Sequence, residues 1–117
     1  MKDWFRNNQP VKETGYATQL WGKDAVAQIN AHNPATPLFL YLAFTAPHAP
    51  YQAPQEYLDK YKHIEDPTRR AYAAMITAMD DEIGNVVAAH CDVWFACDGH
   101  QPTHPRASTR AQHDIAR

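Results

Sequence analysis

An uninterrupted apolar run from Pro37 to Phe44 constrains the fold of this chain more than any other feature. The run does not alternate between apolar and polar residues, and prolines bound it. Such a segment is typical of a strand buried on both faces, as in a parallel sheet covered by helices. The run leads directly into a loop, residues 45–54, in which a single histidine, His48, stands between two prolines.

Helical patterns lie on both sides of this run. From Thr18 to His32, apolar residues recur at three- and four-residue spacing, which predicts an amphipathic helix that the following Asn-Pro pair ends. One or two helical turns are expected within 54–61. A longer helix is expected to start at Asp66, a natural N-cap that is followed by proline at the first helical position. Its apolar stripe consists of Tyr72, Met75, Ile76, Met79, Ile83, Val86 and Val87.

The order of the elements predicts an α/β architecture. Residues 1–17 are expected to be loop, 93–96 a second short buried strand and 98–117 irregular chain. A helix followed by a buried strand, twice over, indicates a mostly parallel sheet covered by helices. Because sheets usually have several strands and this chain supplies two, we expect it to be a piece of a larger domain.

Composition excludes several classes of protein. At 117 residues the chain corresponds to one small domain. Its net charge of −2 gives no electrostatic case for binding nucleic acid or an anionic membrane. The sequence has no apolar stretch of about 18 residues, as a membrane span requires, and no apolar run after its first charge, as a signal peptide requires. Two cysteines are too few for a disulfide framework.

Two polar residues follow the predicted strands at short distance. His48 lies four residues beyond the first strand and Asp98 two residues beyond the second. In open α/β sheets ligands bind beyond the carboxyl ends of the strands, so parallel neighbouring strands would bring these side chains to one rim. There a histidine can donate to an oxyanion while a carboxylate holds a metal ion. The alternative is that both are loop residues without a role.

A zinc site is a second hypothesis for the C-terminal region. Its candidate ligands are Cys91, Cys97, His100 and His104. Five residues separate the cysteines, whereas zinc fingers usually have two to four between them. A tail that is merely rich in histidine explains the same residues.

The sequence also resembles the sulfatase family, especially its arylsulfatase B-like branch, within the alkaline-phosphatase superfamily. The resemblance is carried by the stretch TPLFLYLAFTAPHAPYQAPQEYLDKYKHIEDPTRRAYAAMITAMDDEIGNVVAA and by the preceding GYATQLWGKDAVAQI. Strand, APHAPYQAP loop, turn and helix occur in the family's order and spacing. The resemblance is clear over residues 15–89, whereas 90–117 look like a degraded or irregular tail. It implies that residues 1–117 are a partial sulfatase catalytic domain, part of an alkaline-phosphatase-like sandwich.

The resemblance implies roles for both candidate site residues. A complete relative would hydrolyse sulfate esters, with His48 contacting the sulfate group and Asp98 as a calcium ligand. The stretch VWFACDGHQPTHPRAST looks like an altered form of the family's strand and SDNGGPT loop. In it Cys97 replaces the serine, and the neighbouring asparagine ligand is missing.

The same resemblance predicts that essential parts are absent. The family's nucleophile is a formylglycine made from the cysteine of a Cys-x-Pro/Ala-Ser-Arg motif, and neither Cys91 nor Cys97 stands in one. The paired aspartates of the calcium site, and the lysines and arginine around the sulfate, have no counterpart. We therefore expect a chain that carries a sulfate-binding histidine but is inactive alone. The alternative is a non-catalytic interaction fragment or an unfolded remnant.

Overall fold

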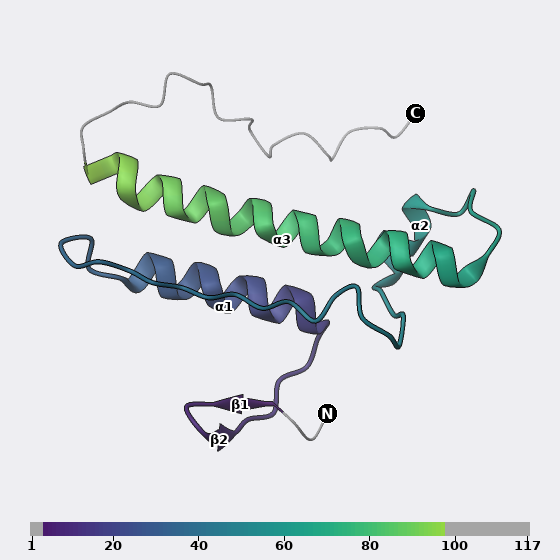
Figure 1. Ribbon diagram of the computed structural model, residues 1–117, viewed down its shortest axis with the longest axis horizontal. Helices are drawn as coiled ribbons and strands as arrows, with labels where there is room; N and C mark the ends of the chain where they lie inside the picture. The colour runs from purple at the N-terminus through teal and green to yellow at the C-terminus, as the bar shows by residue number, and fades with distance from the viewer. Residues whose placement is uncertain (1–3, 98–117) are drawn as a thin grey trace, which may run out of the picture.

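The computed structural model describes residues 4–97, and helices make up most of that part (Figure 1). The helices are α1 (Ala17–Ala31), α2 (Gln55–Lys60) and α3 (Pro67–Cys97). A short hairpin of β1 (Phe5–Arg6) and β2 (Gln9–Pro10) precedes them. Among the described residues, no helix is both long enough and apolar enough to cross a membrane.

The hairpin corrects the prediction that residues 1–17 form only loop. β1 and β2 pair antiparallel, with Arg6 opposite Gln9. Asn7 and Asn8 join them with φ angles of 49° and 65°. Two consecutive residues in the left-handed region give the turn that suits a two-residue hairpin loop, and asparagine tolerates that region better than most residues.

Helices α1 and α3 lie side by side and form the main packing interface (Figure 1). The buried face of α1 consists of Thr18, Gly22, Ala25 and Ile29, at spacings of three and four residues. These residues are mostly small, so the two helix axes can approach closely. A Cβ atom added at Gly22 would lie 2.8 Å from the Cβ of Glu82, which shows how close the backbones are.

The buried face of α3 is not the predicted stripe of large apolar residues. Its buried residues include Ala74, Met75, Ala78, Glu82 and Ala89, so of the predicted stripe only Met75 is among them. Tyr72, Ile76, Ile83 and Val87 are instead 39–55% exposed. The small α1 face selects the alanine side of α3, since bulky side chains there would hold the helices apart.

Helix α3 starts as predicted but ends later. The Asp66 Oδ1 accepts a hydrogen bond from the Arg69 backbone N–H at 2.7 Å, which confirms Asp66 as the N-cap. The predicted strand 93–96 is wrong, because α3 continues to Cys97. A helix makes its hydrogen bonds locally, whereas a four-residue strand needs a neighbouring strand to supply them.

Residues 37–44 are extended but belong to no sheet within the part of the chain that is described. The predicted burial on both faces is wrong: Phe39 is 92% and Tyr41 81% exposed, while Leu38 and Leu42 are half-buried. Alternate side chains thus face the helices and solvent, as the two-residue period of a strand requires. The second face stays open because no described segment covers it.

Helix α2 packs against the first half of α3. Tyr57, which is 7% exposed, packs on Ala74 and Ala78 of α3. Tyr61 extends the contact through a 2.5 Å hydrogen bond between its hydroxyl and that of Thr77. This cluster fixes the point at which the loop 45–54 returns to the helices.

Candidate functional site

The loop that carries His48 is anchored at both ends. Before the histidine, Ala46 is 8% exposed. After it, the ring of Tyr51 meets the ring of Tyr72 edge-on at a centroid distance of 5.8 Å, and Ala53 packs against the cluster around Tyr57. His48 therefore lies at the tip of a loop whose two bases are held against the helices.

The backbone around His48 also fixes its ring. The His48 N–H donates to the Thr45 carbonyl at 2.9 Å, closing a turn. The ring Nδ1 lies 2.5 Å from the Ala49 carbonyl oxygen. Because a carbonyl can only accept, Nδ1 must carry the proton. The exposed ring then presents Nε2 as its second hydrogen-bonding atom, which donates to an anion when the imidazole is protonated.

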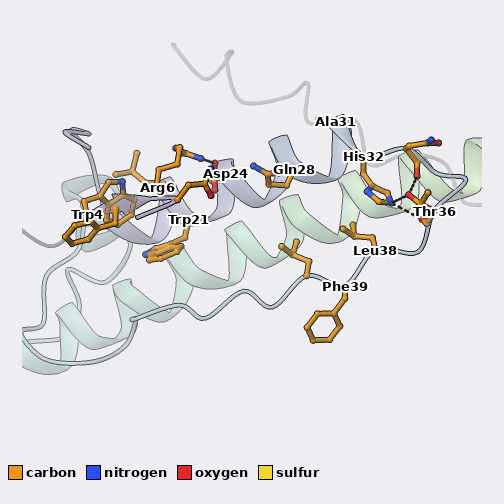
Figure 2. Close-up of a pocket in the computed structure, with 15 residues that line it drawn as sticks. Trp4, Arg6, Trp21, Asp24, Gln28, Ala31, His32, Thr36, Leu38 and Phe39 are labelled. Carbon is orange, nitrogen blue, oxygen red and sulfur yellow. Dashed lines mark hydrogen bonds and ion pairs between the residues drawn. The ribbon is translucent and has the colours of Figure 1, made fainter. Parts of the chain in front are cut away.

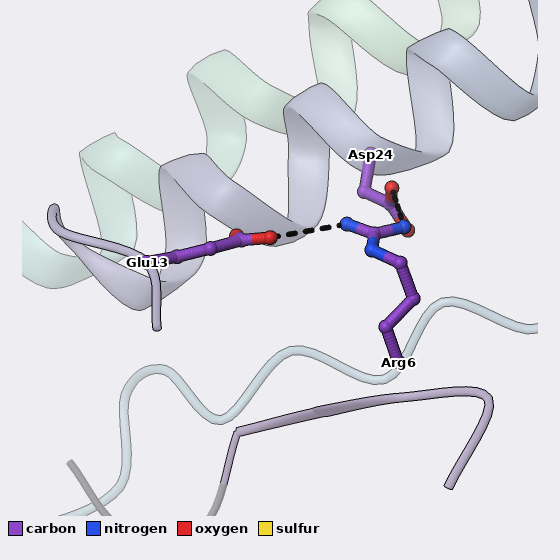
Figure 3. Close-up of polar contacts among 3 residues, drawn as sticks. All are labelled: Arg6, Glu13 and Asp24. Carbon is purple, nitrogen blue, oxygen red and sulfur yellow. Dashed lines mark hydrogen bonds and ion pairs between the residues drawn. The ribbon is translucent and has the colours of Figure 1, made fainter. Parts of the chain in front are cut away.

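A sulfate group also needs cations, and Arg6 is already engaged. Its guanidinium donates to Asp24 at 2.6 Å and to Glu13 at 3.2 Å (Figure 3). The hydrogen bond to Asp24, followed by the one to Glu13, raises the pKa of Arg6. All three side chains are substantially exposed, so water screens these ion pairs and their contribution to stability is small. Their role is to hold the hairpin against α1.

Other basic side chains near α2 and α3 are engaged as well. Arg70 donates to the Ile64 carbonyl from two guanidinium nitrogens, at 2.8 and 2.6 Å. The Lys60 Nζ lies 3.8 Å from the Asp81 Oδ2 across the contact between α2 and α3. These cations therefore hold structure together and do not form a cluster around His48.

The second predicted site residue, Asp98, lies outside the described residues, as do His100 and His104 of the zinc hypothesis. Cys91 is a partly buried free thiol within α3, and Cys97 is the last residue of that helix. Since α3 replaces the predicted strand 93–96, the parallel strand pair that would place His48 and Asp98 at one rim is not formed. Among residues 4–97, no three His, Cys, Asp or Glu side chains gather as a metal site would require.

The structure contains a groove that the sequence did not predict. It has a volume of about 810 Å³ and runs between the hairpin, α1 and the start of the extended segment (Figure 2). Trp4 and Trp21 pack at one end, with ring centroids 5.1 Å apart. Figure 2 shows Asp24 and Gln28 along α1 and His32 just after its C-terminal end, with Leu38 and Phe39 below them on the extended segment. Hairpin and segment come together only in the folded chain, so no local pattern indicated the groove.

Known proteins similar to this chain are found both by a family model and by sequence identity. The Sulfatase family model matches residues 1–90. Arylsulfatase J of Mus musculus is 42% identical over 74 residues, covering 63% of this chain and 12% of that protein. An arylsulfatase of Klebsiella aerogenes is 38% identical over 47 residues, covering 40% of this chain and 10% of that protein.

The fold agrees with this relationship. The crystal structure of Ps i-CgsB in complex with k-i-k-neocarrahexaose matches with a TM-score of 0.66 and 35% identity. The match covers 74% of this chain and 21% of that one, so the chain spans a small part of its relatives' length. A family model over residues 1–90, together with identities above 30% and a shared backbone arrangement, establishes that the chain belongs to the sulfatase family.

Proposed function

We propose that this chain carries the sulfate-contacting histidine of a sulfuric ester hydrolase domain and does not hydrolyse sulfate esters by itself. Family membership supports the substrate class. The observation that carries the assignment of His48 is the state of its ring: Nδ1 is held on the Ala49 carbonyl and the ring is exposed. When the imidazole is protonated, a ring fixed in this way donates from Nε2 to an anion without first having to be ordered.

One histidine cannot hold a sulfate tightly. A hydrogen bond to a charged group contributes about 1.5–3 kcal/mol, whereas a dissociation constant of 1 mM corresponds to about 4.1 kcal/mol. Sulfate affinity at His48 alone is therefore weaker than millimolar. Arg6, Arg70 and Lys60 are already engaged with carboxylate or carbonyl groups elsewhere.

The absence of turnover follows from the nucleophile. Cys91 is followed by Asp92 and Val93, not by the residues from which the family makes formylglycine, and it lies within a helix. Calcium binding needs six to eight oxygen ligands. The described residues do not fit such a site, because no three acidic or histidine side chains meet there, and we assign no step to calcium.

A turnover assay tests the proposal. The purified chain, with calcium present, is incubated with a chromogenic aryl sulfate beside the variants His48→Ala and His63→Ala. His63 is an exposed histidine between α2 and α3 and serves as the matched control. All three proteins should release product at the rate of buffer alone. Turnover above buffer that His48→Ala abolishes and His63→Ala retains would overturn the proposed inactivity.

The alternative function is a non-catalytic interaction fragment. The exposure of Phe39 and Tyr41 favours it, because large apolar side chains at such exposure mark contact surfaces when they cluster. Circular dichroism at a series of concentrations tests this alternative. A cooperative melt with a midpoint independent of concentration, from a monomeric sample, would count against it.

A further inference from the structure

A pair of aromatic rings joins the His48 loop to the start of α3. The ring of Tyr51 meets the ring of Tyr72 edge-on, with the centroids 5.8 Å apart and an interplanar angle of 85°. Tyr51 is 41% and Tyr72 42% exposed, so the pair lies at the surface and is not part of the core between the helices. Edge-on rings attract each other through their quadrupoles, in addition to the apolar area that they bury.

The ring pair lies close in sequence to the carbonyl that holds the His48 ring. Ala49, whose carbonyl oxygen faces the His48 Nδ1, is separated from Tyr51 only by Pro50. The pyrrolidine ring fixes the φ angle of Pro50, and the peptide units on either side of it are planar. A restraint on the backbone of Tyr51 is therefore also a restraint on the direction of the Ala49 carbonyl.

Few other contacts restrain the tip of this loop. Residues 48–50 are exposed, so burial does not hold them in place. Within residues 4–97, no hydrogen bond or ion pair joins 47–52 to any of the three helices. The buried Ala46 and the packed Ala53 hold the two bases of the loop. The ring pair is thus the anchor closest in sequence to the carbonyl that fixes the histidine.

We propose that Tyr72 is a positioning residue for His48, acting through Tyr51 and the Ala49 carbonyl. The value of this role for sulfate binding rests on the function proposed above for His48. A neutral imidazole can carry its proton on either nitrogen, and the hydrogen bond to Ala49 selects Nδ1. Loss of the Tyr72 ring releases Tyr51, and the Ala49 carbonyl is then no longer held opposite Nδ1. The His48 ring consequently loses both its selected tautomer and its fixed orientation.

The tautomer of His48 is a readout that a purely structural role of Tyr72 within α3 would not change. Nitrogen magnetic resonance distinguishes a protonated from an unprotonated ring nitrogen, and is recorded on the labelled full chain at about pH 9, where histidine is neutral. Tyr72→Ala should lower the ratio of Nδ1-protonated to Nε2-protonated ring roughly 2- to 10-fold, as expected for the loss of an edge-on ring pair. Tyr72→Phe retains the ring and should keep the parent ratio. The control Tyr41→Ala removes an exposed tyrosine outside the pair and should also keep it.

Tyr51→Ala tests the same ring pair from the loop and leaves α3 unchanged. Because either substitution removes the same contact, the double variant should show no greater loss of the ratio than each single variant. A parent-like ratio in Tyr72→Ala would overturn the proposal. Losses from Tyr51→Ala and Tyr72→Ala that add in the double variant would overturn it as well, since the two residues would then act independently.

Sulfate titration separates the positioning role from the proposed function. The tautomer ratio is measured without sulfate, so a lowered ratio in Tyr72→Ala without any response of His48 to sulfate would refute the sulfate contact and support the positioning role. Where His48 does respond, Tyr72→Ala should raise its sulfate dissociation constant by up to roughly 2- to 10-fold, because a smaller fraction of the rings is in the binding geometry. An unchanged dissociation constant beside a lowered ratio would overturn the link between ring position and sulfate binding.

Discussion

The contact of Gly22 with Glu82 allows a sharp test of how α1 and α3 pack. A Cβ atom at position 22 would lie 2.1 Å from a carboxylate oxygen of Glu82 and 2.8 Å from its Cβ. The carboxylate can rotate away, but the Cβ of Glu82 is fixed to the α3 backbone. Gly22→Ala therefore forces the two helices apart.

The magnitude follows from two opposing effects. Gly→Ala within a helix stabilises by about 0.8–1.0 kcal/mol through helix propensity. Overpacking at a tight contact costs about 1–3 kcal/mol. Gly22→Ala should consequently lower the free energy of unfolding by about 0–2 kcal/mol.

The structure supplies a matched control in Gly84, at an exposed position of α3. A Cβ atom added there meets nothing within 4 Å, so Gly84→Ala gains propensity without a clash. In urea titrations, the free energy of unfolding of Gly22→Ala should be lower than that of Gly84→Ala by about 1–3 kcal/mol. In thermal melts, each kcal/mol shifts the melting temperature of a chain of about this size by roughly 4–8 °C. Equal stabilisation by both substitutions would refute the close packing of α1 on α3.

Two further predictions concern the ends and the core of the helices. Asp66→Ala removes the side-chain acceptor of the Arg69 N–H and should lower the free energy of unfolding, measured by urea titration, by about 1 kcal/mol. Asp66→Asn keeps an acceptor and should retain most of that stability. An equal loss in both variants would contradict the role of Asp66 as N-cap. Burial, and after it the carboxylate of Asp81, raises the pKa of the Tyr57 phenol. The phenol's contribution to the free energy of unfolding is therefore complete below the ordinary tyrosine pKa of about 10. That contribution is lost as the pH rises through the raised pKa of the folded state. The free energy of unfolding should therefore fall above pH 10, and Tyr57→Phe should reduce that fall; an unchanged slope would count against burial of the phenol.

Local signals in the sequence predicted the helices well. The periodicity before Asn33 and the cap at Asp66 indicated α1 and the start of α3, because helix ends depend on residues close in sequence. The family resemblance was also correct, since the APHAPYQAP loop and its neighbouring helix carry a specific pattern. The α/β class agrees with the sulfatase neighbours, while the sandwich and its parallel sheet stay predictions.

Features that depend on distant neighbours were not predictable. The choice between the alanine side and the bulky side of α3 depends on Gly22 of α1, which no pattern within α3 reveals. The exposure of Phe39, by contrast, was expected for a chain that supplies too few strands, because an apolar strand is buried only where other strands flank it. The prediction for 93–96 failed because a short apolar run extends a helix as readily as it forms a strand.

The sulfate contact of His48 is the central functional claim, and nuclear magnetic resonance of its ring measures it directly. Sodium sulfate is titrated against sodium chloride of equal ionic strength into the full chain and into His63→Gln, with the ring signals assigned by their loss in His48→Gln. The His48 ring signals should shift with a dissociation constant weaker than 1 mM, equally in the parent chain and in His63→Gln, while the ring of His63 stays at its chloride position. Equal responses of His48 and His63, or no response of His48 to sulfate, would contradict its role as the sulfate-contacting residue.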